Sequence, residues 1–388
     1  MRRSRRLTVR LLATLAVGLF AALAVGSGLD RMSGSAPAVA PLVPAPLRAQ
    51  AHRVEARLAL ARGDRAQALQ AAAAAVASDP VIPESTALLA AALVLDGRPA
   101  AADRAFRVAA RFGWREPLVQ RYWFAAARGA GDKARAAERL DALLRADPDQ
   151  AEAAAMLALM ESEPRGQAAM VGRMAARPPW LDHYLAVGGQ LPDRALANRS
   201  ATLAALAAGG TRLGCESVRR FVATALERGA RGPAEQVWTG HCPEARVAHG
   251  LADGGLERLA AGREDPFGWT LQRSGDLSIR WPQDSGADGT GHRLRVRSSA
   301  PVSRLVLRQA IGVPPGRYRL RGEGTAGRFA ASLGCAGEPP LPGAVEGELA
   351  GPGQIIRIGA CPRPMLGIWL RPGAGAAEID SLRLERIG

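Results

Sequence analysis

The stretch GDRAQA at residues 63–68 recurs as GRPAAA at 97–102 and as GDKARA at 131–136, so a glycine and an alanine return together every 34 residues. A period of about 34 is typical of one helix–turn–helix repeat, and a repeat of this kind fixes the fold of its whole segment. We expect each glycine to end the first helix of its unit in a left-handed conformation, which costs little without a Cβ. We expect each alanine where two helices cross closely. These residues are Gly63, Gly97 and Gly131, and Ala68, Ala102 and Ala136.

The pairs Asp79-Pro80 and Asp147-Pro148 close the first and third units. With this spacing, residues 48–147 resemble a tetratricopeptide array, and the resemblance continues in degraded form to about residue 177. It implies a helical solenoid that binds a protein partner. The family usually has a small residue at the position of Phe124, which indicates an altered helix approach or a partner surface there. An unrelated helical bundle with chance spacing is the alternative.

The same resemblance implies that the first helix of each unit lines a concave groove. The basic residues at such positions are Arg53, Arg57, Arg121 and Arg128. They predict a groove for an acidic peptide of the partner, although Glu84, Ala87 and Ala91 interrupt it.

Charge and length limit the function classes. A chain of 388 residues is too long for one core and suits two or three domains. The formal net charge of +15 is typical of nucleic-acid binding. However, Lys133 is the only lysine, which is typical of a GC-rich bacterial genome, so part of the arginine excess is compositional. Because the N-terminus also indicates export, we expect no nucleic-acid partner.

Residues 1–29 indicate membrane insertion. Five arginines precede the uncharged run Leu11–Leu29, which is long enough for a span of about 20 residues. They are Arg2, Arg3, Arg5, Arg6 and Arg10. Arginines before an apolar run stay in the cytoplasm, so we expect a single-pass anchor in a bacterial inner membrane with the later domains in the periplasm. A signal peptide cleaved near Ala22-Leu23-Ala24 is the alternative. The Pro-rich residues 30–47 predict a semi-extended linker that lifts the domains off the membrane.

Four cysteines agree with export. Cys215 and Cys242 lie 27 residues apart, Cys335 and Cys361 lie 26 apart, and neither pair has the Cys-x-x-Cys spacing of zinc or redox sites. Of the three pairings, we expect Cys215–Cys242 within a helical capping region at 178–248 and Cys335–Cys361 within the strand-rich C-terminal part. Crossed pairing and four buried free thiols are the alternatives.

Near residue 250 the hydrophobic period changes from 3.6 to 2. Alternation is clear at 292–298, 303–311, 317–321, 354–358, 366–370 and 379–384. Short strands separated by Gly and Pro turns predict a β-sandwich over residues 249–388.

Three stretches of this region resemble jelly-roll carbohydrate-binding modules. Residues 307–320 are similar to their "Q-x-v … pGxYxL" stretch, 253–257 to their opening strand and 379–384 to their closing strand. The resemblance implies a jelly roll whose first and last strands hold a structural calcium, for which Glu257 and Asp380 are the candidate ligands. Two solvated carboxylates are the alternative.

Two ladders of arginines alternate with apolar residues in this sandwich. The arginines are Arg293, Arg295, Arg297, Arg317, Arg319 and Arg321, and Arg304 and Arg308 extend the set. Alternate residues of a strand share one face, so we expect Leu294, Val296, Tyr318 and Leu320 in the core and the guanidiniums outside. Guanidinium binds carboxylate, phosphate and sulfate in a fork, which predicts an acidic glycan as ligand. Dispersed surface charge is the alternative.

Aromatic residues add one candidate sugar platform, Trp281, whereas Trp369 is expected inside because Ile368 and Leu370 flank it. No metal, nucleophile or phosphate-binding motif is visible in the sequence, so we expect neither an enzyme nor a cofactor. The sequence thus predicts a multidomain chain, α then β: an N-terminal membrane anchor, a tetratricopeptide-like helical solenoid at 48–177, the capping region and a jelly-roll sandwich. The predicted function is non-catalytic: an envelope protein that binds a protein partner and a glycan in surface-polysaccharide assembly or export. The competing hypothesis is a pure protein scaffold with a structural sandwich.

Overall fold

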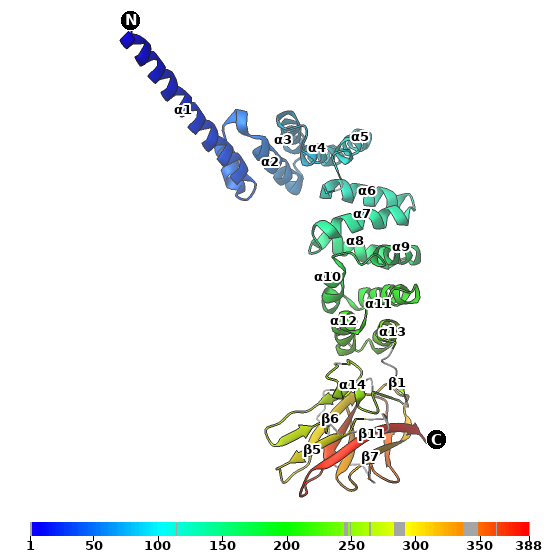
Figure 1. Cartoon of the computed structure of the whole chain (residues 1–388). Helices are drawn as coiled ribbons and strands as arrows, with labels where there is room; N and C mark the ends of the chain where they lie inside the picture. Colours follow the sequence, from blue (N-terminus) through cyan, green and yellow to red (C-terminus); the bar gives the residue numbers. More distant parts are fainter. Residues whose placement is uncertain are drawn as a thin grey trace. The chain divides into compact units, whose positions relative to one another are not determined.

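The computed structural model describes residues 2–113, 115–243, 247–248, 250–263, 265–282, 292–336, 348–361 and 363–387. The chain divides into two compact units, Met1–Arg173 and Met174–Gly388. The first unit is helical, and the second begins with helices and ends in antiparallel sheets (Figure 1). The predicted class, an α region followed by a β region, is confirmed.

The first unit starts with a long helix, α1 (Arg2–Ser33), and two short 3-10 helices, η1 (Pro37–Leu42) and η2 (Ala45–Leu47). Four helix pairs follow: α2 (Ala49–Arg62) with α3 (Arg65–Ser78), α4 (Pro83–Leu95) with α5 (Pro99–Ala110), α6 (Pro117–Gly129) with α7 (Lys133–Ala146), and α8 (Ala151–Glu161) with α9 (Pro164–Met174).

The turns within the first three pairs have one geometry, as the 34-residue period predicts. Gly63, Gly97 and Gly131 have φ of 71°, 74° and 78°. In each turn the residue after the glycine donates its N–H to the carbonyl five residues earlier at 2.9 Å, which satisfies a carbonyl left free at the helix end. The three alanines that follow are fully buried, so helical repeats are confirmed.

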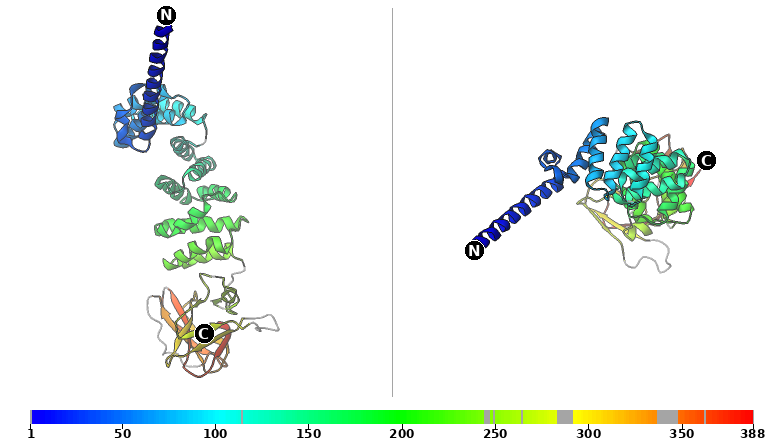
Figure 2. Two further views of the ribbon diagram at one scale, coloured as in Figure 1. Left: turned by 60° about the vertical axis from the view of Figure 1, so that its left-hand side comes forward. Right: turned by 90° about the horizontal axis from the view of Figure 1, so that it is seen from above.

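Helix α1 is apolar over most of its length. Within the described residues, its segment Arg10–Ser33 is long and apolar enough to cross a membrane, with a mean hydropathy of 2.0 and only 6% of the most apolar window buried. A signal sequence has the same features. Figure 2 shows α1 projecting from the helix pairs. Only the C-terminal end of α1 lies near them.

Residues 30–47 are not the semi-extended linker that their composition predicts. They fold back as η1 and η2 against the end of α1, burying Ala40 and Val43 beside Leu29 and Leu47. The prediction failed because Pro37 and Pro41 fit a 3-10 turn as well as an extended chain, and only these tertiary contacts decide between the two.

A carboxylate fastens this end of α1 to the first repeat. Asp30 accepts the backbone N–H groups of Gln50 (2.9 Å) and Ala51 (2.8 Å) at the start of α2. Gly26 allows the close approach, because a Cβ there would lie 2.6 Å from Leu47 Cδ1. The helix that would lie in a membrane is therefore joined directly to the repeat domain.

The second unit begins with the helices α10 (Leu181–Ala186), η3 (Val187–Gln190), α11 (Asp193–Ala208), α12 (Cys215–Glu227) and α13 (Arg231–His241). Cys215 begins α12 and pairs with Cys242, which directly follows α13, at a Cα–Cα distance of 5.1 Å. Cys335 and Cys361 are 6.0 Å apart by the same measure. Both distances suit disulfides, and both expected pairs are confirmed.

A buried histidine beside the first disulfide makes the stability of this helical region pH-dependent. His241 is 1% exposed; its Nδ1 accepts the N–H of Leu213 (3.1 Å), and Nε2 donates to the carbonyl of Leu203 (3.0 Å). Burial lowers the pKa of His241 below its ordinary 6.5. The unfolded chain then binds the proton more readily, so the stabilisation is complete above about pH 6.5 and is lost as pH falls through the folded pKa. The protection factors of α11 and α13 amides, corrected for the intrinsic pH dependence of exchange, should fall between pH 7 and pH 5.

The control is His241→Gln, which removes the titration. This variant should be less stable at neutral pH, and its stability should change less between pH 7 and pH 5. If it keeps the pH dependence of the parent, another group is responsible.

The C-terminal part contains the remaining elements. They are β1 (Val247–Ala248), β2 (Leu251–Ala252), α14 (Glu257–Ala260), β3 (Thr270–Leu271), β4 (Leu277–Arg280), β5 (Leu294–Ser298), β6 (Arg304–Ala310), β7 (Gly316–Gly324), β8 (Phe329–Cys335), β9 (Gln354–Ile358), β10 (Pro364–Leu370) and β11 (Ala377–Arg386). Strands β1 and β2 pair with each other. The other strands form a four-stranded sheet, β3-β6-β10-β8, and a five-stranded sheet, β4-β5-β11-β7-β9, both antiparallel.

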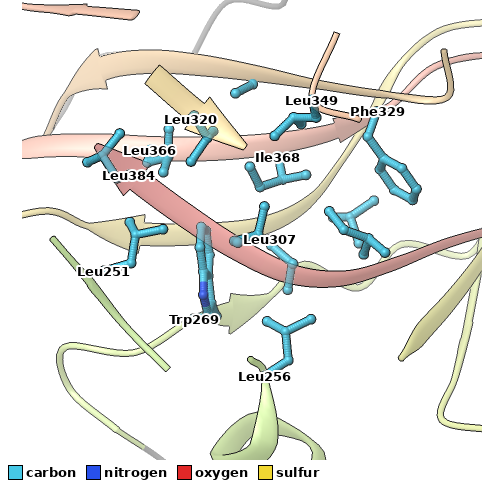
Figure 3. Packing of buried hydrophobic residues seen from close by; sticks show 14 of the residues in the cluster. Leu251, Leu256, Trp269, Leu307, Leu320, Phe329, Leu349, Leu366, Ile368 and Leu384 are labelled. Atoms are coloured by element: carbon cyan, nitrogen blue, oxygen red, sulfur yellow. The ribbon is translucent and has the colours of Figure 1, made fainter. Parts of the chain in front are cut away.

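The two sheets share one apolar core (Figure 3). Leu307 and Ile368 come from the four-stranded sheet, and Leu320 and Leu384 come from the five-stranded sheet. All of them are at most 4% exposed. The packing of two antiparallel sheets confirms the β-sandwich expected from the alternation.

The segment 253–257 is not the opening strand that its resemblance implies. The strand ends at Ala252, and Asp253 accepts the N–H groups of Arg258 (3.0 Å) and Leu259 (2.9 Å). This carboxylate thereby starts a short helix, α14, at Glu257. The aspartate that the resemblance placed in a strand acts as a helix cap.

Candidate ligand-binding surfaces

The two arginine ladders lie on the outer face of the five-stranded sheet. Strands β5 and β7 flank β11. Leu294, Val296, Tyr318 and Leu320 are buried, as expected, so the alternating arginines point away from the core.

Two of the three arginines in the β5 ladder, Arg293 and Arg295, are neutralised by carboxylates of β11; Arg297 is exposed and has no ion pair among the described residues. Arg295 Nε donates to Glu378 Oε1 at 2.7 Å, and Arg293 Nη1 lies 3.4 Å from Glu378 Oε2. Arg293 Nε is also 3.9 Å from Asp380. These guanidiniums are occupied within the sheet.

The ladder on β7 has a different environment. Arg317 stands opposite Arg357 of β9, and Arg321 stands opposite Arg383 of β11. All four side chains are exposed, and none forms an ion pair with another described residue. Like charges directly opposite one another destabilise a sheet. We call these four residues the β7 arginine patch.

Sequence reasoning missed half of this patch. Arg357 and Arg383 each alternate with buried apolar residues, and this signal is visible in QIIRI and in SLRLER. Arg319, the middle residue of the β7 ladder, faces Glu385 in the register.

The tryptophans differ from expectation. Trp281, the expected sugar platform, is half-buried and packs against the sandwich core. Trp369 lies on the outer face of the four-stranded sheet, where its Nε1 donates to Ser332 Oγ at 2.6 Å. Ile368 and Leu370 are buried, and period-2 alternation places the residue between them on the opposite face. The expectation that Trp369 packs inside was wrong.

The two carboxylates predicted to bind calcium have no further metal ligand beside them among the described residues. Glu257 begins α14, and Asp380 lies on β11 near Arg293. In the described part of the chain, no group of three or more His, Cys, Asp or Glu side chains could hold a metal ion.

In the first unit, every arginine of the predicted groove lies beside a carboxylate of a later element. Arg57 Nη1 is 3.4 Å from Glu84, Arg121 Nη1 is 2.6 Å from Glu152, and Arg128 Nη2 is 3.1 Å from Glu163. Arg53 lies 3.5 Å from Asp79 and 3.7 Å from Glu84. The arginines connect successive helix pairs, so carboxylates within the array partly neutralise their charge.

A cavity of about 630 Å³ opens beside these ion pairs, between α6 and α8. Phe124 and Arg128 line one side, and Met156 and Leu159 line the other. Leu159 is 41% exposed. Hydrogen bonds from Lys133 and Arg128 hold the pKa of Glu163 below its ordinary value. The cavity is thus apolar in its walls and charged at one rim.

No model of a known protein family matches the chain, and no curated protein matches its sequence.

Proposed function

We propose that the protein is a non-catalytic, membrane-anchored envelope protein whose sandwich binds an acidic polysaccharide through the β7 arginine patch. The repeats bind a protein partner, and the two activities serve the assembly or export of a surface polysaccharide. The proposed location is a bacterial inner membrane crossed by α1, with the helix pairs and the sandwich in the periplasm.

One observation carries the glycan proposal: four exposed arginines face one another in two cross-strand pairs, and no described carboxylate forms an ion pair with them. A polyanion laid across β11, β7 and β9 would bridge both pairs and relieve their repulsion. Guanidinium binds carboxylate in a planar, two-point fork. In the neighbouring β5 ladder, Arg293 and Arg295 are already paired with Glu378.

Two further observations support the location. The apolar part of α1 follows five arginines, an order that retains the N-terminal end in the cytoplasm. Disulfides persist in oxidising compartments outside the cytosol, and both cysteine pairs lie at disulfide distance.

We expect Arg317→Gln/Arg357→Gln to weaken binding of polygalacturonate to the full-length protein in detergent micelles about tenfold. The estimate takes about 0.7 kcal/mol for each exposed charge. Titration calorimetry at 50 and 300 mM salt measures it, and higher salt should weaken binding by the parent because exposed charges are screened.

The matched control is Arg293→Gln/Arg295→Gln, which removes the same charge from the same sheet. It should leave polygalacturonate affinity nearly unchanged. Equal losses in both variants would indicate a non-specific charge effect, and absence of binding to polygalacturonate by the parent would favour the scaffold hypothesis.

The cavity between α6 and α8 supports the partner-binding half of the proposal. Ala155, Met156 and Leu159 follow one another at helical spacing on one side of α8 and face Phe124 across the cavity. Because the nearby guanidiniums already bind carboxylates, the favoured occupant is an apolar segment of the partner instead of an acidic peptide.

A photo-crosslinking residue at Ala155 should join the protein to one discrete partner in intact cells, and Leu159→Glu should abolish the product by placing a charge in the apolar wall. A crosslinker at Arg135, which is exposed on α7, is the control and should give no such product. Retention of the Ala155 product in Leu159→Glu would place the partner elsewhere.

A further inference from the structure

The outer face of the four-stranded sheet contains a second, smaller cavity. Its volume is about 330 Å³, at the lower end of the range for small-molecule sites, ~300–1,000 Å³. Thr270 of β3 stands opposite Arg308 of β6, and Arg308 stands opposite Gly367 of β10. Three neighbouring strands therefore form its floor, and Pro266 and Gly268 form part of its rim.

Two arginines that line this cavity have hydrogen-bond donors without a partner among the described residues. The Nε atoms of Arg308 and Arg363 are both buried and have no partner among the described residues. Neither side chain forms an ion pair within the described ranges. A buried donor without a partner is unfavourable, and two guanidiniums without a carboxylate partner among the described residues favour a bound anion.

A third cation increases the positive charge at this edge of the sandwich. Arg231 of α13 donates from Nη1 to the carbonyl of Ala310 at 3.4 Å, while its Nε is also buried without a partner. Its pKa is lowered by burial and by the charge of Arg363. Arg231 is not among the described residues that line the cavity, so it adds positive charge near Arg363 but no contact to a ligand there.

The cavity also offers polar side chains that a simple anion would not use. Thr270 of β3 and Gln272, two residues further along, line it. Alternate residues of a strand share one face, so both lie on the side of the sheet that carries Arg308. Gln309 is on the opposite face, where its Nε2 donates to the carbonyl of Ala252 at 2.6 Å. A ligand that uses the whole cavity therefore carries hydroxyls as well as a negative charge.

The disulfide holds one wall of the cavity in place. Ala336, next to Cys335, donates its N–H to the carbonyl of Arg363 at 3.0 Å, and Cys335 stands opposite Pro364 in the register. The Cys335–Cys361 pair thus fixes the backbone that carries Arg363.

We propose that this cavity binds one acidic sugar residue. Its carboxylate is held by Arg308 and Arg363, and its ring hydroxyls form hydrogen bonds with the side chains of Thr270 and Gln272. Met365 offers an apolar surface to the C–H face of the ring. The choice of an acidic sugar as ligand rests on the proposed function, but the site is separate. The β7 arginine patch would bind several charges along a polymer, whereas this cavity would bind a single sugar residue.

The test uses full-length protein in detergent micelles and three monomeric probes: sodium galacturonate, galactose and inorganic phosphate. Galacturonate should bind at least tenfold more tightly than galactose or phosphate, because only galacturonate offers both the carboxylate and the hydroxyls. Equal or tighter binding of either competitor, or absence of galacturonate binding, would overturn the assignment. This comparison needs no variant and holds even where a substitution impairs folding.

Two variants localise the site. Arg363→Gln should weaken galacturonate binding at least tenfold, and Arg317→Gln, on the other sheet, should leave it unchanged. Loss in Arg317→Gln with retention in Arg363→Gln would move the site to the β7 arginine patch. Binding of galacturonate without binding of polygalacturonate would support this inference and contradict the proposed function. Binding of polygalacturonate without binding of galacturonate would support the proposed function and contradict this inference.

Discussion

Tyr318→Ala should destabilise the sandwich by roughly 3–5 kcal/mol, the usual cost of removing a buried aromatic side chain. Tyr318 is 3% exposed in the shared core, and its hydroxyl donates to the carbonyl of Pro314 at 2.7 Å. It stands opposite Ile356 of β9 and Arg386 of β11, so the substitution would leave a cavity under β7, between these two strands. Hydrogen exchange resolved by peptide should show β7, β9 and β11 opening together.

The neighbouring residue provides the matched control. Arg319→Gln changes the outward position next along β7 and should shift stability by about 0.5 kcal/mol or less, as surface substitutions usually do. Tyr318→Phe should lose about 1 kcal/mol with the hydroxyl hydrogen bond. If Arg319→Gln destabilises more than Tyr318→Ala, the strand register is inverted by one residue.

Cys215→Ala/Cys242→Ala should cost the helical part of the second unit roughly 3–4 kcal/mol. On the chain-entropy model, a bridge that closes a loop of this length limits the unfolded chain by about that amount, and the two cysteines are 27 residues apart. Because Cys242 is fully buried, the variant also loses packing. Hydrogen exchange in α12 and α13 should accelerate strongly, and non-reducing peptide mapping of the parent should recover the joined peptides.

Cys335→Ala/Cys361→Ala is the comparison for this experiment. It should accelerate exchange at the end of β8 and the start of β10 and leave α12 and α13 nearly unchanged. Recovery of a crossed peptide, such as one joining Cys215 to Cys335, would contradict the pairing within each region.

The parts of the fold that the sequence predicts are those determined by local chemistry. The turns at Gly63, Gly97 and Gly131 need a residue that accepts positive φ, and this need is visible in a single chain. Strands β5, β6, β7, β9, β10 and β11 all match predicted alternating segments. Strand β8, read as FAASLGC, was missed because small residues give no clear alternation, and β3 has only two residues.

The candidate sites depend on strand order, which the sequence does not carry. Arg317, Arg357 and Arg383 are up to 66 residues apart and meet because β7 lies between β9 and β11. Arg308 was predicted to extend the arginine ladders, but β6 belongs to the other sheet. Glu378 could not be recognised as the partner of Arg293 and Arg295 before β11 was placed beside β5.

The fastening of α1 through Asp30 affects how the protein would meet a membrane-bound partner. If α1 holds the chain in a bilayer, the contacts of Asp30 with α2 leave no flexible linker between α1 and the first helix pair. The first helix pair then stays close to the lipid headgroups. A partner embedded in the same membrane is then encountered by diffusion in two dimensions, and its surface density replaces its bulk concentration in setting the encounter rate. A rigid attachment also raises the effective concentration of each protein for the other, as short connections do in general. Affinity measured with the two proteins free in solution would understate their association on the membrane.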